Sequence, residues 1–324
     1  MGITRHCAEL LEAGQKFHYL YGNRLANHLP MALIALDRLG ATQAQLQGYF
    51  DKASTRLQPI EASAGASDLH FPALRGRGEH YFLPAKQFFQ EQIAAHGREK
   101  TIREFLPRLL PSIATSAFHA MIRLAYAVDA RHAEETAAAL AYWTVDYQEF
   151  PSNAETKPHN CARIIADVTE RYPKIEFSKG IIVDHMLDVV RQPDWMQTKV
   201  QPENINLEDI ARVALDAYLG TGDFTLLHGV TSCHAMRLLL PFCDNPRFAL
   251  RCYWEGLVVA YLSTGPKPVV SPELNREELP GWNTLIQGAC ASSNDHRIKL
   301  TYSCHEESAH YGWPEYQAAA AMQA

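Results

Sequence analysis

Four histidines lie inside apolar stretches of the sequence that have the spacing of helices: His28, His119, His228 and His296. A buried imidazole needs a partner for each ring nitrogen, because each unsatisfied group costs about 1–3 kcal/mol. A metal ion is the partner that most readily collects imidazoles from separate helices. The four histidines therefore point to a shared metal site as one explanation of their burial.

Each histidine also has a structural explanation when it is taken alone. His28 stands two residues before Pro30, near the start of a helix, where it could be a cap or a core residue. Asp295 could likewise cap a surface helix that begins beside His296. The residue types by themselves do not decide between a ligand and a capping or core residue.

Polar residues share helical faces with two of these histidines. Arg123 and Tyr126 follow His119 on one face of an apolar helix, which predicts either a ligand site or a structural hydrogen-bond network. Thr231 shares a face with His228. His234 points elsewhere, because six residues advance a helix by about 600°.

Helical periodicity dominates the chain, and no convincing alternating strand is present. Helices are expected near 7–21, 27–39, 42–53, 84–97, 110–128, 131–147, 158–171, 180–191, 206–219, 223–240, 246–262, 281–291 and 295–311. The pairing of Thr42 with Gln45 predicts a capping box, and Asn206 predicts a helix start. We expect an all-α protein, with residues 1–324 forming one large domain of antiparallel helix pairs and a site in the helix interior.

Two longer segments interrupt the helical pattern, 58–82 and 262–280. Loops of this length in compact domains are usually functional covers or linkers. The first contains Phe71 and Tyr81, so it is expected either to cover a pocket or to be a simple excursion. The second could be another cover or a subdomain border.

Composition and motifs exclude several classes of protein. The net charge is −6 and the basic residues are scattered, which argues against nucleic-acid binding. No apolar run reaches the roughly 18 residues of a membrane span, and the beginning of the chain lacks a signal-peptide pattern, so a cytoplasmic location is expected. The sequence also lacks dinucleotide, phosphate-binding, zinc-protease and Cys-x-x-Cys motifs.

The stretches NHLPMALIALDRLGATQAQLQGYFD, AFHAMIRLAYAVDA, LLHGVTSCHAMRLLL and DHRIK resemble segments of the questin oxidase-like family. The resemblance runs from about residue 20 to 312. Fungal members of the family are described as oxidases that open the quinone ring of anthraquinones, and they were long viewed as NADPH-dependent Baeyer–Villiger enzymes. Related members that cleave an anthraquinone ring are understood to use non-haem iron, held by four histidines and a carboxylated lysine.

This resemblance implies that His28, His119, His228, His296 and Lys299 are metal ligands, with Lys299 as the carboxylated residue. A desolvated lysine loses its proton more easily, and the neutral amine can add carbon dioxide. The product is an oxygen ligand beside imidazoles, a mixture suited to Fe(II). NADPH is a further expected reductant.

The expected function is therefore an Fe(II)-dependent oxygenase that cleaves a polycyclic aromatic or quinone-type substrate with O₂. Arg123 would hold a phenolate or an oxyanion, Tyr126 would donate or relay a proton, and Phe71, Tyr81 and Thr231 would contact the substrate. One alternative is a metal-independent, NADPH-dependent Baeyer–Villiger monooxygenase. Another is a non-catalytic helical ligand-binding protein, in which the four histidines lie far apart, or pair with carboxylates and carbonyls instead of converging. The oligomeric state cannot be derived from the sequence.

Overall fold

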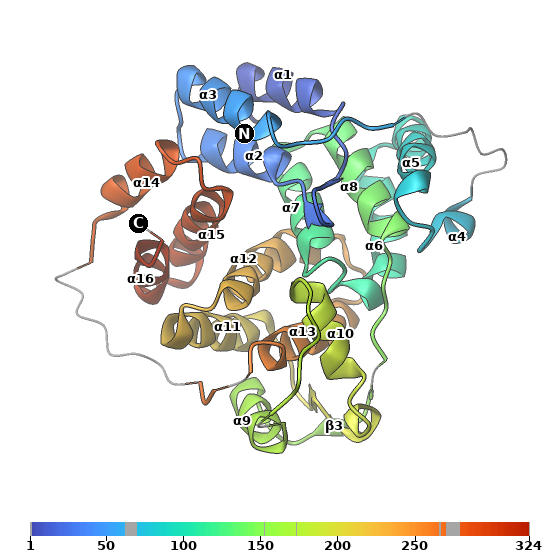
Figure 1. Ribbon diagram of the computed structural model, residues 1–324, viewed down its shortest axis with the longest axis vertical. Coiled ribbons are helices and arrows are strands. Elements are labelled where there is room, and N and C mark those ends of the chain that lie inside the picture. The colour runs from blue at the N-terminus through green and yellow to red at the C-terminus, as the bar shows by residue number, and fades with distance from the viewer. Residues whose placement is uncertain are drawn as a thin grey trace.

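A computed structural model describes residues 2–61, 70–151, 153–172, 174–265, 267–269 and 279–323. These residues form sixteen α-helices, while the only strands among them are four segments of two residues each. The predicted all-α class is confirmed. Figure 1 shows the two ends of the chain, coloured blue and red, meeting at one side of the molecule.

The N-terminal part contains three helices and a small hairpin. Its elements are α1 (Arg5–Gly14), β1 (Leu20–Tyr21), β2 (Leu25–Ala26), α2 (Leu29–Arg38) and α3 (Gln43–Ser54). The Thr42 capping box with Gln45 is present as predicted. The first helix is shorter than expected, because the chain turns after Gly14 into the antiparallel hairpin.

The next part forms α4 (Phe71–Leu74), α5 (Phe82–His96), α6 (Arg98–Leu109), α7 (His119–Ala130) and α8 (Ala133–Val145). The expected loop over 58–82 thus contains the short helix α4 and a 3₁₀ turn at Glu79–Tyr81. Residues 62–69 of that loop lie outside the described part of the chain.

The expectation of one helix over 110–128 is wrong. A 3₁₀ turn covers Leu110–Ser112, and Ser116, Ala117 and Phe118 then have φ angles of 50°, 54° and 68°. Three successive left-handed residues without a glycine leave no simple trace in a sequence, since this backbone conformation is uncommon for other residues. The turn makes His119 the first residue of α7.

The third part contains α9 (Cys161–Arg171), α10 (Ile182–Val190), α11 (Leu207–Thr221), α12 (Phe224–Leu239) and α13 (Pro246–Leu262), together with the parallel strands β3 (Thr156–Lys157) and β4 (Gln201–Pro202). Asn206 caps α11 as predicted. The last part forms α14 (Trp282–Cys290), α15 (Asp295–Tyr311) and α16 (Glu315–Ala321). Within the second expected loop, residues 266 and 270–278 lie outside the described chain.

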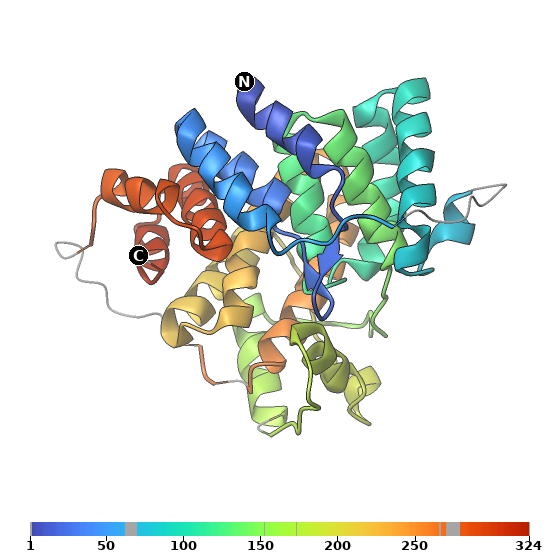
Figure 2. The ribbon, with the colours of Figure 1, turned by 45° about the horizontal axis from the view of Figure 1, so that its top comes forward.

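Four helices from distant parts of the sequence close into a ring in the middle of the molecule. Helix α2 packs against α7 and α15, and α12 packs against the same two helices from the other side. Figures 1 and 2 show α7 and α12 near the centre of the molecule, next to the N-terminal helices and the α14–α16 group. The interior of this ring is apolar, with residues such as Ile34, Ile122 and Ile298 fully buried.

None of the described helices is both long enough and apolar enough to cross a lipid bilayer.

Candidate metal centre

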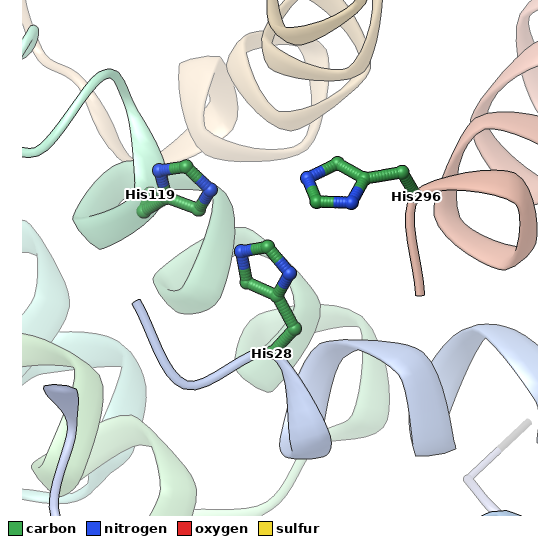
Figure 3. A group of neighbouring side chains, drawn as sticks. All are labelled: His28, His119 and His296. Carbon is green, nitrogen blue, oxygen red and sulfur yellow. The ribbon is translucent and has the colours of Figure 1, made fainter. Parts of the chain in front are cut away.

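Each helix of the central ring carries one of the four predicted histidines near its beginning. His28 is the residue before α2, His119 is the first residue of α7, His296 is the second of α15 and His228 is the fifth of α12. The four helices therefore all begin at the same place. Figure 3 shows His28, His119 and His296 pointing toward one another from three of these helix starts.

The four imidazole rings form one cluster. The centroid of the His28 ring lies 4.7 Å from that of His119 and 4.7 Å from that of His296. The His228 ring lies 4.8 Å from His119 and 5.2 Å from His296. Ligand nitrogens of His28, His119 and His296 all lie within 4.8 Å of one another, close enough for one metal ion to reach all three.

The hydrogen-bonding of the cluster is that of metal-ligating histidines. The Nδ1 atoms of His119 and His228 lie 2.5 Å and 2.9 Å from the backbone carbonyls of Ser116 and Phe224. All four Nε2 atoms are buried and have no partner among the described residues. A ligating histidine typically uses one nitrogen to fix the ring and leaves the other for the metal.

Asp295 fixes the remaining two rings. Its two carboxylate oxygens lie 3.2 Å from Nδ1 of His28 and 2.9 Å from Nδ1 of His296, and Arg56 also pairs with it at 2.5 Å. Burial opposes the charge on this carboxyl, but the hydrogen bonds from His28 and His296 outweigh it and hold its pKa far below the usual range. The alternative of Asp295 as a helix cap is wrong, because Asn294 caps α15.

The site keeps its imidazoles neutral. Burial, reinforced by the charge of Lys299, lowers the pKa of His28 to about 3. Burial and the neighbouring imidazoles hold the pKa values of His119 and His228 well below normal. The positive ends of the helix dipoles at the four helix starts act in the same direction. Neutral imidazole is the form that binds a metal.

Lys299 lies one turn after His296 on α15 and is 1 % exposed. Its charge lowers the pKa of each of the four histidines, which places it beside the whole cluster. Burial lowers its own pKa to about 8, so a substantial fraction of the amine is neutral near physiological pH. The lysine singled out by the sequence is thus close to the histidines and able to lose its proton.

A cavity of about 1130 Å³ opens onto the cluster and is lined by all four histidines. Aromatic side chains contribute to its wall, with Tyr19, Tyr147, Phe177 and Phe224 among the lining residues. The Phe224 ring lies 5.1 Å from His228 and 4.6 Å from His296, and it is half exposed at the cavity wall. A cavity of this size accommodates a polycyclic aromatic molecule next to the imidazoles.

Two polar residues predicted from the face of His119 do not line this cavity. Arg123 is buried and forms an ion pair with Glu135, with Nε 2.5 Å and Nη2 3.1 Å from the carboxylate oxygens. Tyr126 is buried behind the cluster, where its hydroxyl lies 3.3 Å from that of Ser303. These contacts favour the structural network over the predicted catalytic roles.

The three predicted substrate contacts also lie away from the cavity lining. Phe71 packs in an aromatic cluster, where the centroid of its ring lies 5.2 Å from that of Phe105. The Tyr81 hydroxyl accepts a hydrogen bond from Arg77. Thr231 lies buried on α12, with its hydroxyl 3.3 Å from the carbonyl of His228. The long first loop reaches the cavity instead through Gly76, Gly78 and Glu79.

Sequence reasoning missed the residues that orient the imidazoles. Asp295 directly precedes His296, and an acid beside a candidate ligand is the one local signal that could have identified it. Ser116 and Phe224 contribute only backbone carbonyls to the histidines. A role of that kind has no side-chain signature, so the sequence could not show it.

The fold and the site together define an all-helical protein with a buried histidine cluster beneath an aromatic cavity. The profile of the questin oxidase-like family matches residues 25–304, which include α2, α7, α12 and the beginning of α15, and thus all four histidines. The chain therefore belongs to the questin oxidase-like family, and the family implies an oxidase or oxygenase. A comparison with curated proteins gave no significant match.

Proposed function

We propose that this protein is a non-haem, Fe(II)-dependent oxygenase that cleaves a ring of a polycyclic aromatic or quinone-type substrate with O₂. The observation that carries the proposal is a cluster of four imidazole rings at the wall of a large cavity, each with a buried Nε2 atom that has no partner among the described residues. The family supports the oxidative chemistry. The non-catalytic alternative expects histidines that lie far apart, or that pair with carboxylates and carbonyls instead of converging. Their Nδ1 atoms do face such groups, but the rings also form one cluster and each Nε2 atom is left without a partner among the described residues, which favours the metal site.

The donor set fits a metal ion. Imidazole nitrogen binds iron, zinc, copper and nickel well, so the histidines alone do not select among them. His28, His119, His228 and His296 would hold the ion, and Asp295 would fix two of the rings. Bound iron would supply the activation of O₂, chemistry for which the protein side chains have no equivalent.

Lys299 would complete the set as a carbamate. Its neutral Nζ would attack CO₂, forming a nitrogen–carbon bond, and the released proton would pass to water. The carbamate carries one negative charge, which the four helix starts would stabilise at this position. It would also supply the oxygen ligand that the described histidine cluster lacks.

The protein's own residues would position the substrate and exclude water. The aromatic wall of Tyr19, Tyr147, Phe177 and Phe224 would contact the faces of the rings. Gly76 and Gly78 of the first loop line the cavity and would close one side of it. The substrate would thus lie against the imidazole cluster in a dry pocket.

The proposal is tested by metal analysis of protein reconstituted with Fe(II) under argon, followed by O₂ uptake with a reduced hydroxyanthraquinone. We expect one iron per chain, and O₂ uptake that stops after chelation and returns with iron. Incorporation of labelled bicarbonate into wild-type protein, but not into Lys299→Arg, tests the carbamate. Full activity with NADPH after chelation would instead establish the metal-independent alternative and overturn the proposal.

A further inference from the structure

One polar group in the cavity wall has no part in the proposed metal centre. Asp146 lines the cavity and accepts hydrogen bonds from the hydroxyl of Tyr19 at 2.7 Å and from that of Ser116 at 3.1 Å. Both donors line the same cavity. A carboxylate has about four lone-pair positions, so two remain for a ligand.

The position of Asp146 is electrostatically unfavourable for the fold. It caps the C-terminal end of α8, where the helix dipole disfavours negative charge. No lysine or arginine in the described part of the chain forms an ion pair with it, and burial raises the pKa of this carboxyl. A partly buried carboxylate at the C-terminal end of a helix is poor for stability, which favours a role in ligand binding.

The carboxylate is held in a fixed relation to the histidine cluster. Ser116 donates its hydroxyl to Asp146, while its carbonyl lies 2.5 Å from Nδ1 of His119. Ser116 also begins the run of three left-handed residues that leads into α7. Backbone strain of this kind persists where surrounding contacts enforce it. One strained turn therefore connects the carboxylate to a candidate metal ligand.

We propose that Asp146 binds a phenolic hydroxyl of the aromatic substrate as a hydrogen-bond acceptor and so selects hydroxylated rings over ring ethers. The ring would lie between Asp146 and the imidazole cluster, with Tyr19 beside the hydroxyl. This inference rests on the proposed function, since it takes the cavity ligand to be an aromatic substrate. It assigns the recognition of the substrate oxygen to Asp146 instead of Arg123.

The test compares two probes, 2-hydroxyanthraquinone and 2-methoxyanthraquinone, with the full chain under argon so that no turnover occurs. Dissociation constants are measured by fluorescence at about pH 7, because the raised pKa of Asp146 requires a higher pH for ionisation than an ordinary carboxyl does, while an ordinary phenol stays neutral there. Asp146→Asn should weaken the hydroxy probe about 10-fold more than the methoxy probe, because a hydrogen bond to a charged acceptor is lost. Glu79→Gln, which alters another carboxylate at the same cavity, is the control and should show no such discrimination.

A second measurement needs no variant and guards against misfolding of Asp146→Asn. In the wild type, the preference for the hydroxy probe should fall as the pH is lowered through the raised pKa of Asp146. The other titratable or charged groups facing this carboxyl are Tyr19, Tyr142, Glu79 and Arg24. Tyr19 and Tyr142 stay neutral and Arg24 charged at acid pH, and the Glu79→Gln control reports any contribution from Glu79.

Equal weakening of both probes by Asp146→Asn, or a hydroxyl preference that does not change with pH, would overturn the inference. Repeating the binding measurements after chelation separates it from the metal proposal. If the protein binds no iron on reconstitution but still discriminates between the two probes, the oxygenase proposal is refuted and the role of Asp146 stands. If the protein binds one iron per chain but does not discriminate between the two probes, the role of Asp146 is refuted and the metal proposal stands.

Discussion

Two buried polar clusters lie on the same pair of helices, α12 and α15. At the helix starts, the rings of His228 and His296 lie next to those of His119 and His28 at the wall of a cavity. Farther along the same helices, His234 lies 2.7 Å from Glu307, which also pairs with Arg237 at 2.7 Å. His228 and His234 are both almost completely inaccessible to solvent, so burial does not distinguish these two histidines.

The difference lies in what the imidazoles face. His234 faces the charged carboxylate of Glu307. The rings of Tyr126 and Tyr302 pack against the His234 ring, with centroid distances of 6.2 Å and 5.3 Å. The four site histidines face one another, and their Nδ1 atoms are held by groups outside the cluster. A buried imidazole paired with a carboxylate stabilises a fold, whereas several convergent imidazoles with free nitrogens form a binding site.

The largest expected effect is on metal affinity, which should depend on the histidines at the helix starts and not on His234. His228→Ala should weaken metal binding by more than about 100-fold, because the loss of a group that only orients a ligand already costs about 10–100-fold. The matched change His234→Ala should leave one metal ion per chain. Metal content after dialysis against a graded chelator measures both, and equal metal loss in the two variants would remove the distinction between the clusters.

Stability should show the opposite order. His234→Ala leaves Glu307 buried with Arg237 as its remaining charged partner, so the free energy of unfolding should fall by about 3 kcal/mol. His228→Ala should cost less in metal-free protein, because it removes the contact with the carbonyl of Phe224 and takes no partner from a buried charge. Urea unfolding followed by circular dichroism measures the two values. A larger loss for His228→Ala would show that the site cluster is itself a structural element.

Asp295→Asn should have an intermediate effect on metal affinity, a loss of about 10–100-fold. The amide keeps the shape of the side chain but removes the charge that holds His28 and His296. Thr231→Ser, a small change beside His228 and outside the cavity lining, is the control. Unchanged affinity in Asp295→Asn, measured by competition with a chelator, would mean that packing alone orients these two rings.

The smallest expected effect is in the pH dependence of stability. The folded pKa of His28 is depressed to about 3, so below the ordinary value of 6.5 the unfolded chain binds a proton that the folded chain does not. Stability of the metal-free protein should thus fall as the pH drops, by about 1 kcal/mol per depressed histidine from pH 6.5 to 5.5. Asp295, whose pKa is depressed, loses its contribution only below its ordinary range near pH 4.

Urea unfolding at a series of pH values compares the wild type with His28→Gln. In the variant the free energy of unfolding should decline less steeply as the pH falls, because about one proton fewer is taken up on unfolding. The same slope in both proteins would show that His28 is not held neutral by the fold. Adding metal should steepen the decline in the wild type, since protons and metal then compete for the same imidazoles.

Much of the secondary structure followed from local pattern. The apolar spacing predicted α2, α3 and α13 closely, and the capping residues Thr42 and Asn206 marked the starts of α3 and α11. The helices α6 and α16 were not predicted. The break before His119 was also missed, because its left-handed residues are held by contacts with Asp146 and His119 and not by their own propensities.

The sequence by itself determined the helical class and supplied four histidines and a lysine in apolar surroundings. Only the tertiary structure decided that the four imidazoles meet, since they come from helices separated by up to 268 residues in the chain. It also assigned Asp295 to orienting two rings, moved Arg123 into an ion pair and placed Asp146 at the cavity. The physical reason is that periodicity fixes which face of a helix is buried, whereas the partner of a buried polar group is set by whichever helix packs against that face.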